Sequence, residues 1–159
     1  MTPPFRIRRA LPSDASACAA TMRAAIRALL PGVHPARALA AWASLPPLYH
    51  RWAMGPGGET YLVAARTGRV LGYAALRGDE LTAVFVRPRA QGAGVGRALV
   101  LAAASRARRG GARSLRVLAA RAAIEFYAAL GFRGAAPVRV PLPGGLTLDS
   151  VRMRRPLLP

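Results

Sequence analysis

The alternation of apolar and polar positions along the chain predicts a series of β-strands. Residues Phe5–Leu11 alternate apolar and charged side chains, which is typical of a strand with one buried face. Other segments are short apolar runs bounded by glycine or proline, such as the pair on either side of the turn Thr67–Arg69. Strands are expected at residues 5–11, 61–65, 70–76, 80–86, 114–118, 138–142 and 146–153.

Apolar residues at helical spacing predict helices between these strands. Ser13–Asp14 supplies an N-cap for the first helix, and the glycines at 110–111 and 131 can end later ones in a left-handed conformation. Residues 48–58, which include a Gly-Pro-Gly-Gly turn, are expected to be irregular. The predicted helices cover residues 15–30, 36–44, 98–109 and 122–130.

The order of these elements predicts the fold class. Strands and helices follow as β-α-α-β-β-β-α-β-α-β-β, which gives an α/β protein with one mixed, mostly antiparallel sheet and about four helices on its faces. The strands at 80–86 and 114–118 are expected to be parallel, because a helix connects them. With 159 residues and neither a polar linker nor an internal repeat, residues 1–159 are expected to form a single domain.

Composition narrows the class of protein. A hydrophobic fraction of 53% with 19% charged residues argues against a disordered chain. No apolar stretch approaches the roughly 20 residues that span a membrane, and the start of the chain lacks the apolar core of a signal peptide. Cys18 is the single cysteine and cannot form an intramolecular disulfide, so the cytoplasm is the simplest location.

The formal net charge of +18 raises the question of a nucleic-acid partner, since basic surfaces gain affinity by displacing phosphate counterions. All 24 basic residues are Arg, however, and the chain contains neither Lys nor Asn. This pattern indicates a compositional bias in which Arg replaces solvated Lys, and the arginines are also scattered. We therefore favour bias together with a small polyanionic ligand, and keep a nucleic-acid partner as the less favoured alternative.

A glycine-rich segment, Gln91–Arg97, joins a predicted strand to the helix that follows. Strand, glycine turn and helix together point backbone N–H groups and the positive end of a helix dipole at a phosphate. A nucleotide P-loop requires Lys, and a dinucleotide fold requires Gly-x-Gly-x-x-Gly with an acidic residue about 20 positions later. Here Lys is absent, the glycines are spaced differently, and no acidic residue lies between Glu80 and Glu125. A tight turn without a ligand is the alternative.

Two motifs follow one another in the second half of the chain. The first is Val86-x-Pro88-x-x-Gln91-Gly92-x-Gly94-Val95-Gly96-x-x-Leu99, and the second is Ala123-x-x-Phe126-Tyr127-x-x-Leu130-Gly131-Phe132. In this order and separation they resemble the acetyl-CoA signature and the second signature of the GNAT superfamily of N-acetyltransferases. The resemblance is tightest over residues 80–133 and is to single-domain bacterial members. It implies the GNAT fold, with acetyl-CoA as cosubstrate and no metal.

The resemblance also implies where CoA binds. Backbone amides from Gln91 to Gly96 would hold the pyrophosphate with help from Arg97, and the main chain around Val84–Val86 would bind the pantetheine arm and polarise the acetyl carbonyl. Many members have Asn shortly before the catalytic tyrosine, whereas residues 118–122 are Leu-Ala-Ala-Arg-Ala, so that contact is absent or made by backbone. The expected CoA-binding residues are Val84, Phe85, Val86, Gln91, Gly92, Ala93, Gly94, Val95, Gly96 and Arg97.

Tyr127 is the candidate general acid. Its spacing before Gly131–Phe132 is that of the family tyrosine, so the resemblance implies that it protonates the departing CoA thiolate. The alternative is an aromatic side chain that only packs on the pantetheine arm.

Glu80 is the candidate general base. It precedes Gln91 by eleven residues, the offset at which some relatives carry a catalytic Glu. Strand alternation is expected to place it on one face with Thr82 and Val84. The alternative is a solvated carboxylate beside Asp79, in which case a water chain would remove the proton or the amine would arrive neutral.

The expected function is direct transfer of an acetyl group from acetyl-CoA to a primary amine, on a small molecule or on a peptide or protein N-terminus. Trp42, Tyr49, His50 and Trp52 lie in the segment that shapes the acceptor pocket of the superfamily, although packing explains each equally well. Two histidines and one cysteine make no zinc set, and a monomer or homodimer is expected. A CoA-binding sensor without turnover and a transferase for a nucleic-acid-linked amine are the alternatives.

Overall fold

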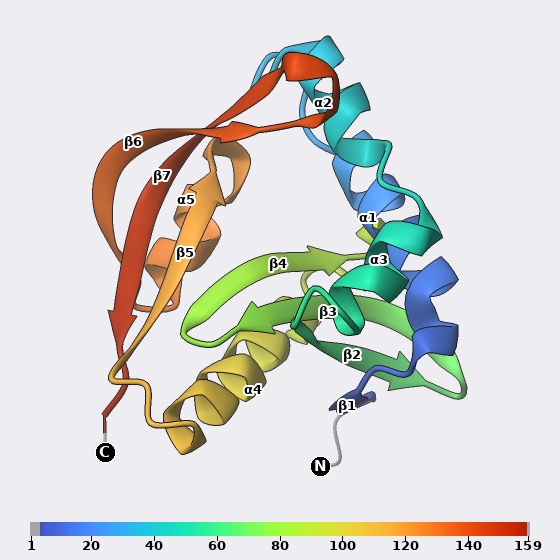
Figure 1. Cartoon of the computed structure of the whole chain (residues 1–159), viewed down its shortest axis with the longest axis vertical. Coiled ribbons are helices and arrows are strands. Elements are labelled where there is room, and N and C mark those ends of the chain that lie inside the picture. The colour runs from blue at the N-terminus through green and yellow to red at the C-terminus, as the bar shows by residue number, and fades with distance from the viewer. Residues whose placement is uncertain (1–3, 159) are drawn as a thin grey trace.

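A computed structural model describes residues 4–158 of the chain as a mixed α/β fold built on one seven-stranded sheet, with strand order β1-β2-β3-β4-β5-β7-β6 (Figure 1). Within this range no helix is long and apolar enough to cross a membrane. The strands are β1 (Arg6–Arg9), β2 (Thr60–Arg66), β3 (Arg69–Arg77), β4 (Glu80–Val86), β5 (Ser114–Ala120), β6 (Arg133–Pro141) and β7 (Thr147–Pro156). The α-helices are α1 (Ala15–Arg27), α2 (Ala36–Ala43), α3 (Pro47–Met54), α4 (Val95–Arg109) and α5 (Ile124–Ala129).

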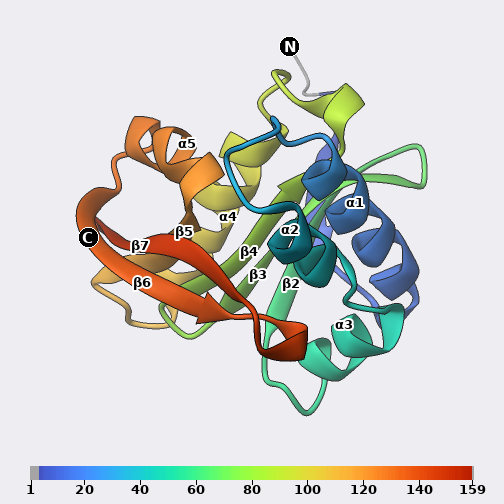
Figure 2. The ribbon, with the colours of Figure 1, turned by 90° about the horizontal axis from the view of Figure 1, so that it is seen from above.

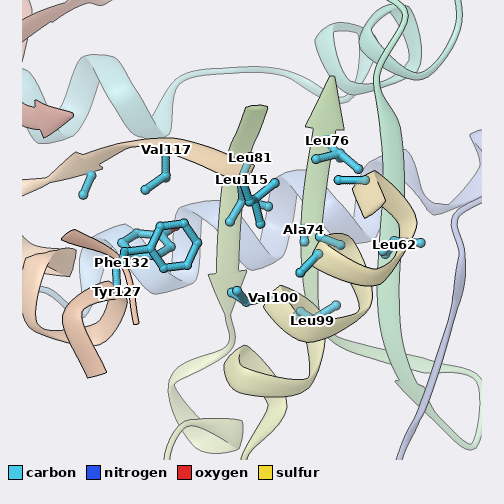
Figure 3. Packing of buried hydrophobic residues seen from close by; sticks show 14 of the residues in the cluster. Leu62, Ala74, Leu76, Leu81, Leu99, Val100, Leu115, Val117, Tyr127 and Phe132 are labelled. Atoms are coloured by element: carbon cyan, nitrogen blue, oxygen red, sulfur yellow. The ribbon is translucent and has the colours of Figure 1, made fainter. Parts of the chain in front are cut away.

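Two apolar clusters cover the two faces of the sheet. On one face α4 packs across β2, β3 and β4, and Leu99 and Val100 from this helix lie among Leu62, Leu81 and Leu115 (Figure 3). On the other face α1 packs on β3 and β4 and also contacts α2 and α3 (Figure 2). Successive residues of β2 alternate between the two clusters: Leu62 belongs to the first, whereas Tyr61 and Val63 belong to the second. This is the pattern of a strand that is buried on both faces.

The strands β4 and β5 are parallel, as predicted from the helix that connects them, but they separate almost at once. Only Glu80↔Arg116 and Leu81↔Val117 are paired, after which the two strands diverge (Figure 1). Every other neighbouring pair in the sheet is antiparallel. The sheet is therefore open in its middle, between the strand that precedes the glycine-rich loop and the strand that precedes α5.

A β-bulge at Thr82 changes the alternation of β4. Leu81 pairs with Leu76 and Ala83 pairs with Ala75, so Thr82 has no partner on β3. Glu80 therefore lies on the same face as Ala83, whereas Val84 lies on the opposite, α4-covered face. The predicted common face for Glu80, Thr82 and Val84 is wrong, because simple alternation takes no account of the inserted residue.

Three further differences from the sequence prediction have local causes. Residues 48–58 were expected to be irregular, but α3 occupies most of this segment, because Pro47 takes the first helical position where a missing N–H costs nothing. Helix α1 ends at Arg27 rather than at residue 30. The Asp14 side chain does not cap α1; instead it accepts hydrogen bonds from the Leu11 N–H and from Arg8.

A substitution at Gly72 tests how closely α4 packs on the sheet. It pairs with Val86, and a Cβ added there would lie 2.9 Å from the Phe85 carbonyl oxygen and 3.1 Å from Val95 Cγ1. Because backbone blocks one side, Gly72→Ala is expected to lower the free energy of unfolding by about 1–3 kcal/mol in urea titrations.

Gly110→Ala is the matched control for this substitution. Gly110 has an ordinary φ of −78°, and an added Cβ would come no closer than 3.4 Å to its neighbours. This variant should be unchanged or more stable by up to about 1 kcal/mol. Equal destabilisation of both variants would contradict the close packing of α4 on β3.

Candidate active site

A cavity of about 720 Å³ passes through the sheet at the opening between β4 and β5. Its lining combines residues from both apolar clusters: Val95 and Tyr127 come from the face covered by α4 and α5, whereas Ile26 and Tyr73 come from the face covered by α1. A cavity lined from both faces can accommodate two ligands that meet in the plane of the sheet.

One end of the cavity is formed by the glycine-rich loop and the first turn of α4. Gly92 and Gly94 have φ values of +80° and +85°, which glycine adopts without strain, and Gly94 is the N-cap of α4. The first intrahelical bond runs from the Ala98 N–H to the Gly94 carbonyl at 3.0 Å. Among residues 4–158, no partner accepts from the N–H groups of 92–97, so they are available to an anion at the positive end of the helix.

The open edge of β4 carries a second set of backbone groups that, within residues 4–158, pair with no neighbouring strand. Gln91 Nε2 donates to the Val86 carbonyl at 3.1 Å, so this carbonyl points away from β3 and toward the opening. By strand alternation the main-chain groups of Val84 point the same way, whereas the Phe85 carbonyl faces Gly72 on β3. Val84 and Val86 thus present backbone to the cavity, and Phe85 presents its side chain.

Tyr127 reaches the cavity from α5. Its ring packs edge-on against Phe126 and Phe132, with centroid separations of 5.0 and 5.3 Å, and the residue is 5% exposed. Figure 3 shows Tyr127 and Phe132 side by side beside Val117 of β5. Burial raises the pKa of the Tyr127 hydroxyl, so the side chain holds its proton at neutral pH.

The opposite end of the cavity contains the two acidic side chains that line it. Glu80 starts β4, directly opposite Arg77 of β3, and is half-buried. Glu59 precedes β2, is 5% exposed, and lies 3.7 Å from Arg77 Nη2. The sequence analysis did not single out Glu59. Its position two residues before Tyr61, directly before the strand that neighbours the one ending in Arg77, was the available signal.

Aromatic side chains surround this acidic end. Tyr61 and Tyr73 stack with their ring centroids 5.3 Å apart and an interplanar angle of 4°, and Phe85 and Trp42 continue the wall. Of the four residues expected near the acceptor, Trp42, Tyr49 and His50 line the cavity, whereas Trp52 does not.

His50 lies at the centre of this aromatic group and is 1% exposed. Its Nδ1 shares a hydrogen bond with the Tyr61 hydroxyl at 2.9 Å. Its Nε2 is, within residues 4–158, the one fully buried side-chain nitrogen or oxygen without a hydrogen-bond partner. Burial lowers the pKa of His50 to about 4, so the imidazole is neutral at physiological pH.

The segment between α1 and α2 is tied to the other half of the sheet. His34 is buried, and its Nε2 accepts a hydrogen bond from the Ala122 N–H at 3.3 Å, which ties this segment to the turn just before α5. Helix α2 also contacts the β6–β7 turn at Pro143–Gly145 (Figure 1). Both contacts bridge the two halves of the sheet on either side of the opening.

This arrangement agrees with comparisons to known proteins. The profile of the Acetyltransferase (GNAT) family matches residues 23–132. The chain belongs to the GNAT family of acetyltransferases. It is therefore an acyl-CoA N-acyltransferase whose cosubstrate is acetyl-CoA. Its mixed sheet is the GNAT fold that the sequence predicted, with five α-helices within residues 4–158 where about four were expected. A search of curated proteins finds no match.

Solved structures support the same assignment. A GCN5-related N-acetyltransferase from Rhodopseudomonas palustris superposes with a TM-score of 0.89 at 31% identity, covering 99% of this chain and 98% of that one. A phosphinothricin acetyltransferase from Sinorhizobium meliloti, in complex with acetyl-CoA, has a TM-score of 0.68 at 25% identity over 97% and 89% of the chains. A ribosomal-protein-alanine N-acetyltransferase from Brucella melitensis has a TM-score of 0.69 at 26% identity over 96% and 99%.

The neutral state of His50 in this GNAT acetyltransferase predicts a pH dependence of stability. An unfolded His titrates near pH 6.5, whereas folded His50 titrates at about 4. Between these values the unfolded chain binds the extra proton, so the free energy of unfolding should fall as the pH is lowered from 6.5 toward 4. Urea titrations across this range should show a shallower decline for His50→Gln.

His34→Gln provides the comparison, because burial lowers the pKa of His34 in the same direction. It should flatten the curve less than His50→Gln does. Parallel curves for the wild type and His50→Gln would contradict a neutral, buried His50.

Proposed function

We propose that this protein transfers the acetyl group of acetyl-CoA directly to a primary amine, carried by a small molecule or by a peptide or protein N-terminus. The observation that carries the proposal is the cavity through the sheet. One end offers free N–H groups at a helix N-terminus, and the other offers carboxylates among aromatic rings. An anionic thioester and a cationic amine can each occupy the end that suits their charge.

On the CoA side, the N–H groups of the glycine-rich loop and the first turn of α4 would bind the pyrophosphate, and Arg97 would add a charge-assisted hydrogen bond. Arg97 is the one arginine among the residues that line the cavity. The main chain of Val84 and Val86 would hydrogen-bond the pantetheine arm along the open edge of β4. An N–H on that edge would also polarise the acetyl carbonyl.

In the proposed reaction, Glu80 takes a proton from the ammonium group of the acceptor, and the freed nitrogen attacks the carbonyl carbon of the thioester. The tetrahedral intermediate then collapses, the carbon–sulfur bond breaks, and Tyr127 donates its proton to the departing thiolate. The nitrogen loses its second proton to water, which leaves the neutral amide, and Tyr127 takes a proton back from the solvent. Burial holds the Tyr127 hydroxyl in its protonated form, so it carries the proton that this step needs. The cavity lining contains no cysteine, which supports direct transfer rather than an acyl-enzyme.

The remaining expectations belong to the same proposal. Residues 1–159 would act as one catalytic domain, as a monomer or homodimer in the cytoplasm. Neither a nucleic acid nor a membrane is proposed as a partner, since most arginines lie away from the cavity and the charge is accounted for by compositional bias. Small-molecule amines and peptide N-termini, rather than nucleic-acid-linked amines, are therefore the first acceptors to screen.

The direct test combines two measurements. Calorimetry should show acetyl-CoA binding, and an amine screen should show CoA thiol release that depends on both the enzyme and the amine, with mass spectrometry detecting one added acetyl group. Binding without release on any primary amine would favour a CoA sensor. Absence of acetyl-CoA binding would contradict the proposal altogether.

Tyr127→Phe should lower kcat by about 10²-fold or more, because general acid catalysis is lost while the ring is kept. The Kd of acetyl-CoA, measured by calorimetry, should stay within about threefold of the wild type. Glu80→Gln should instead lose activity most at neutral pH and recover as the pH rises, because a neutral amine needs no base. Equal loss of kcat and acetyl-CoA affinity in Tyr127→Phe would indicate a packing role.

A further inference from the structure

The amine end of the cavity is acidic although the protein as a whole is strongly basic. Two of the six acidic residues, Glu59 and Glu80, line the cavity, and both lie beside Arg77 on the middle strand between them. Arg77 does not line the cavity and half of its side chain is exposed. Arg116, which pairs with Glu80 across the β4–β5 ladder, does not line the cavity either, so the charged side chains that line this end are the two carboxylates.

Glu59 is the more deeply buried of the two carboxylates. Its side chain is 4% exposed, and within residues 4–158 its one charged partner is Arg77 at 3.7 Å, which is longer than a hydrogen bond. Burial raises the hydroxyl pKa of Tyr49, Tyr61 and Tyr73, and the charge of Glu59 adds to the rise in each case. A buried carboxylate that lines a cavity beside several tyrosines, while its guanidinium partner lies outside the lining, is a site for a positively charged group.

Within residues 4–158, no cationic side chain lines this end of the cavity, where it could bind a carboxylate. Arg97 lies at the far end of the cavity, beside the glycine-rich loop, and His50 is neutral. An acceptor that carries a carboxylate next to its amine would bring that group into an apolar chamber beside Glu59 and Glu80. Such a group would lose its hydration without gaining a partner.

The walls of the same chamber are flat and aromatic. Tyr61 and Tyr73 stack in parallel, Tyr73 leans on Phe85, and Phe85 meets Trp42 edge-on. Aromatic faces attract cations and pack well against planar apolar groups. The carboxylates and the aromatic walls at this end of the cavity thus both favour a molecule that combines a positive charge with a planar apolar group.

We propose that the acceptor is an aromatic amine with a single positive charge and no carboxylate, held by Glu59 against the Tyr61–Tyr73 wall. This inference rests on the proposed acetyl transfer and names the class of amine that the site accepts. Glu59 is a binding residue in this account, and Glu80 remains the proposed base.

Three commercially available amines isolate the effect of the carboxylate. Phenethylamine, phenylalaninamide and phenylalanine share the aromatic ring and the amine; they differ in carrying a hydrogen, a neutral amide or a carboxylate. Phenethylamine and phenylalaninamide should exceed phenylalanine in kcat/KM by about tenfold or more. The same order should hold for Kd values measured by calorimetry on the protein saturated with CoA. Butylamine, which lacks the ring, should bind more weakly than phenethylamine.

Glu59→Gln tests the residue itself. It should raise the Kd and KM of phenethylamine about tenfold while the Kd of acetyl-CoA is unchanged, and it should shrink the preference for phenethylamine over phenylalanine. Asp149→Asn is the matched control, because Asp149 is an exposed carboxylate that does not line this cavity. It should leave both quantities at their wild-type values. Glu59→Asp, which keeps the charge, should retain the preference.

The two readouts separate failure of this inference from failure of the proposed function. Amine acetylation with phenylalanine equal to or better than phenethylamine overturns the acceptor class while acetyl transfer stands. Ordered amine binding to the CoA complex without acetylation supports the acceptor site and overturns transfer. If Glu59→Gln and Asp149→Asn behave alike while acetyl-CoA still binds both, the role of Glu59 is overturned.

Discussion

The structure depends on the early separation of β4 and β5, which stay together for two residue pairs only. Backbone N–H and C=O groups inside a protein are costly to leave unpaired. Along the diverging part of β4 those groups belong to Val84 and Val86, and the Gln91 side chain satisfies one of them. A ligand with amides of its own, such as the pantetheine arm, would complete the sheet there. The fold and the binding site are thus consequences of one interruption in strand pairing.

The distribution of charge follows from the same interruption. The opening joins the face that carries the N-terminus of α4 to the face that carries Glu59 and Glu80. Most of the 24 arginines lie away from the cavity, so the net charge of the protein says little about its ligands. Local geometry gives each end of the cavity its own sign, positive from helix N–H groups and negative from two carboxylates.

Sequence patterns predicted the sheet, the parallel β4–β5 pair, the glycine-rich turn before α4 and the family, because these depend on alternation and glycine spacing that are local in the chain. The acceptor end was predicted poorly. Glu59 meets Arg77 and the tyrosines only after β2, β3 and β4 pair. Helix α3 was missed because Pro46 and Pro47 at its start were interpreted as the end of the preceding helix. The bulge at Thr82, which moves Glu80 to the face of Ala83, depends on register across the hairpin and leaves no mark on the sequence.

The bridge formed by His34 and Ala122 has a kinetic consequence. It joins the segment between α1 and α2 to the residues just before α5, across the opening between β4 and β5. In the proposed reaction the two substrates approach from opposite faces of the sheet, so neither would have to pass through the space that the other occupies. Either substrate could then associate first, and the acetylated product could leave while CoA is still bound.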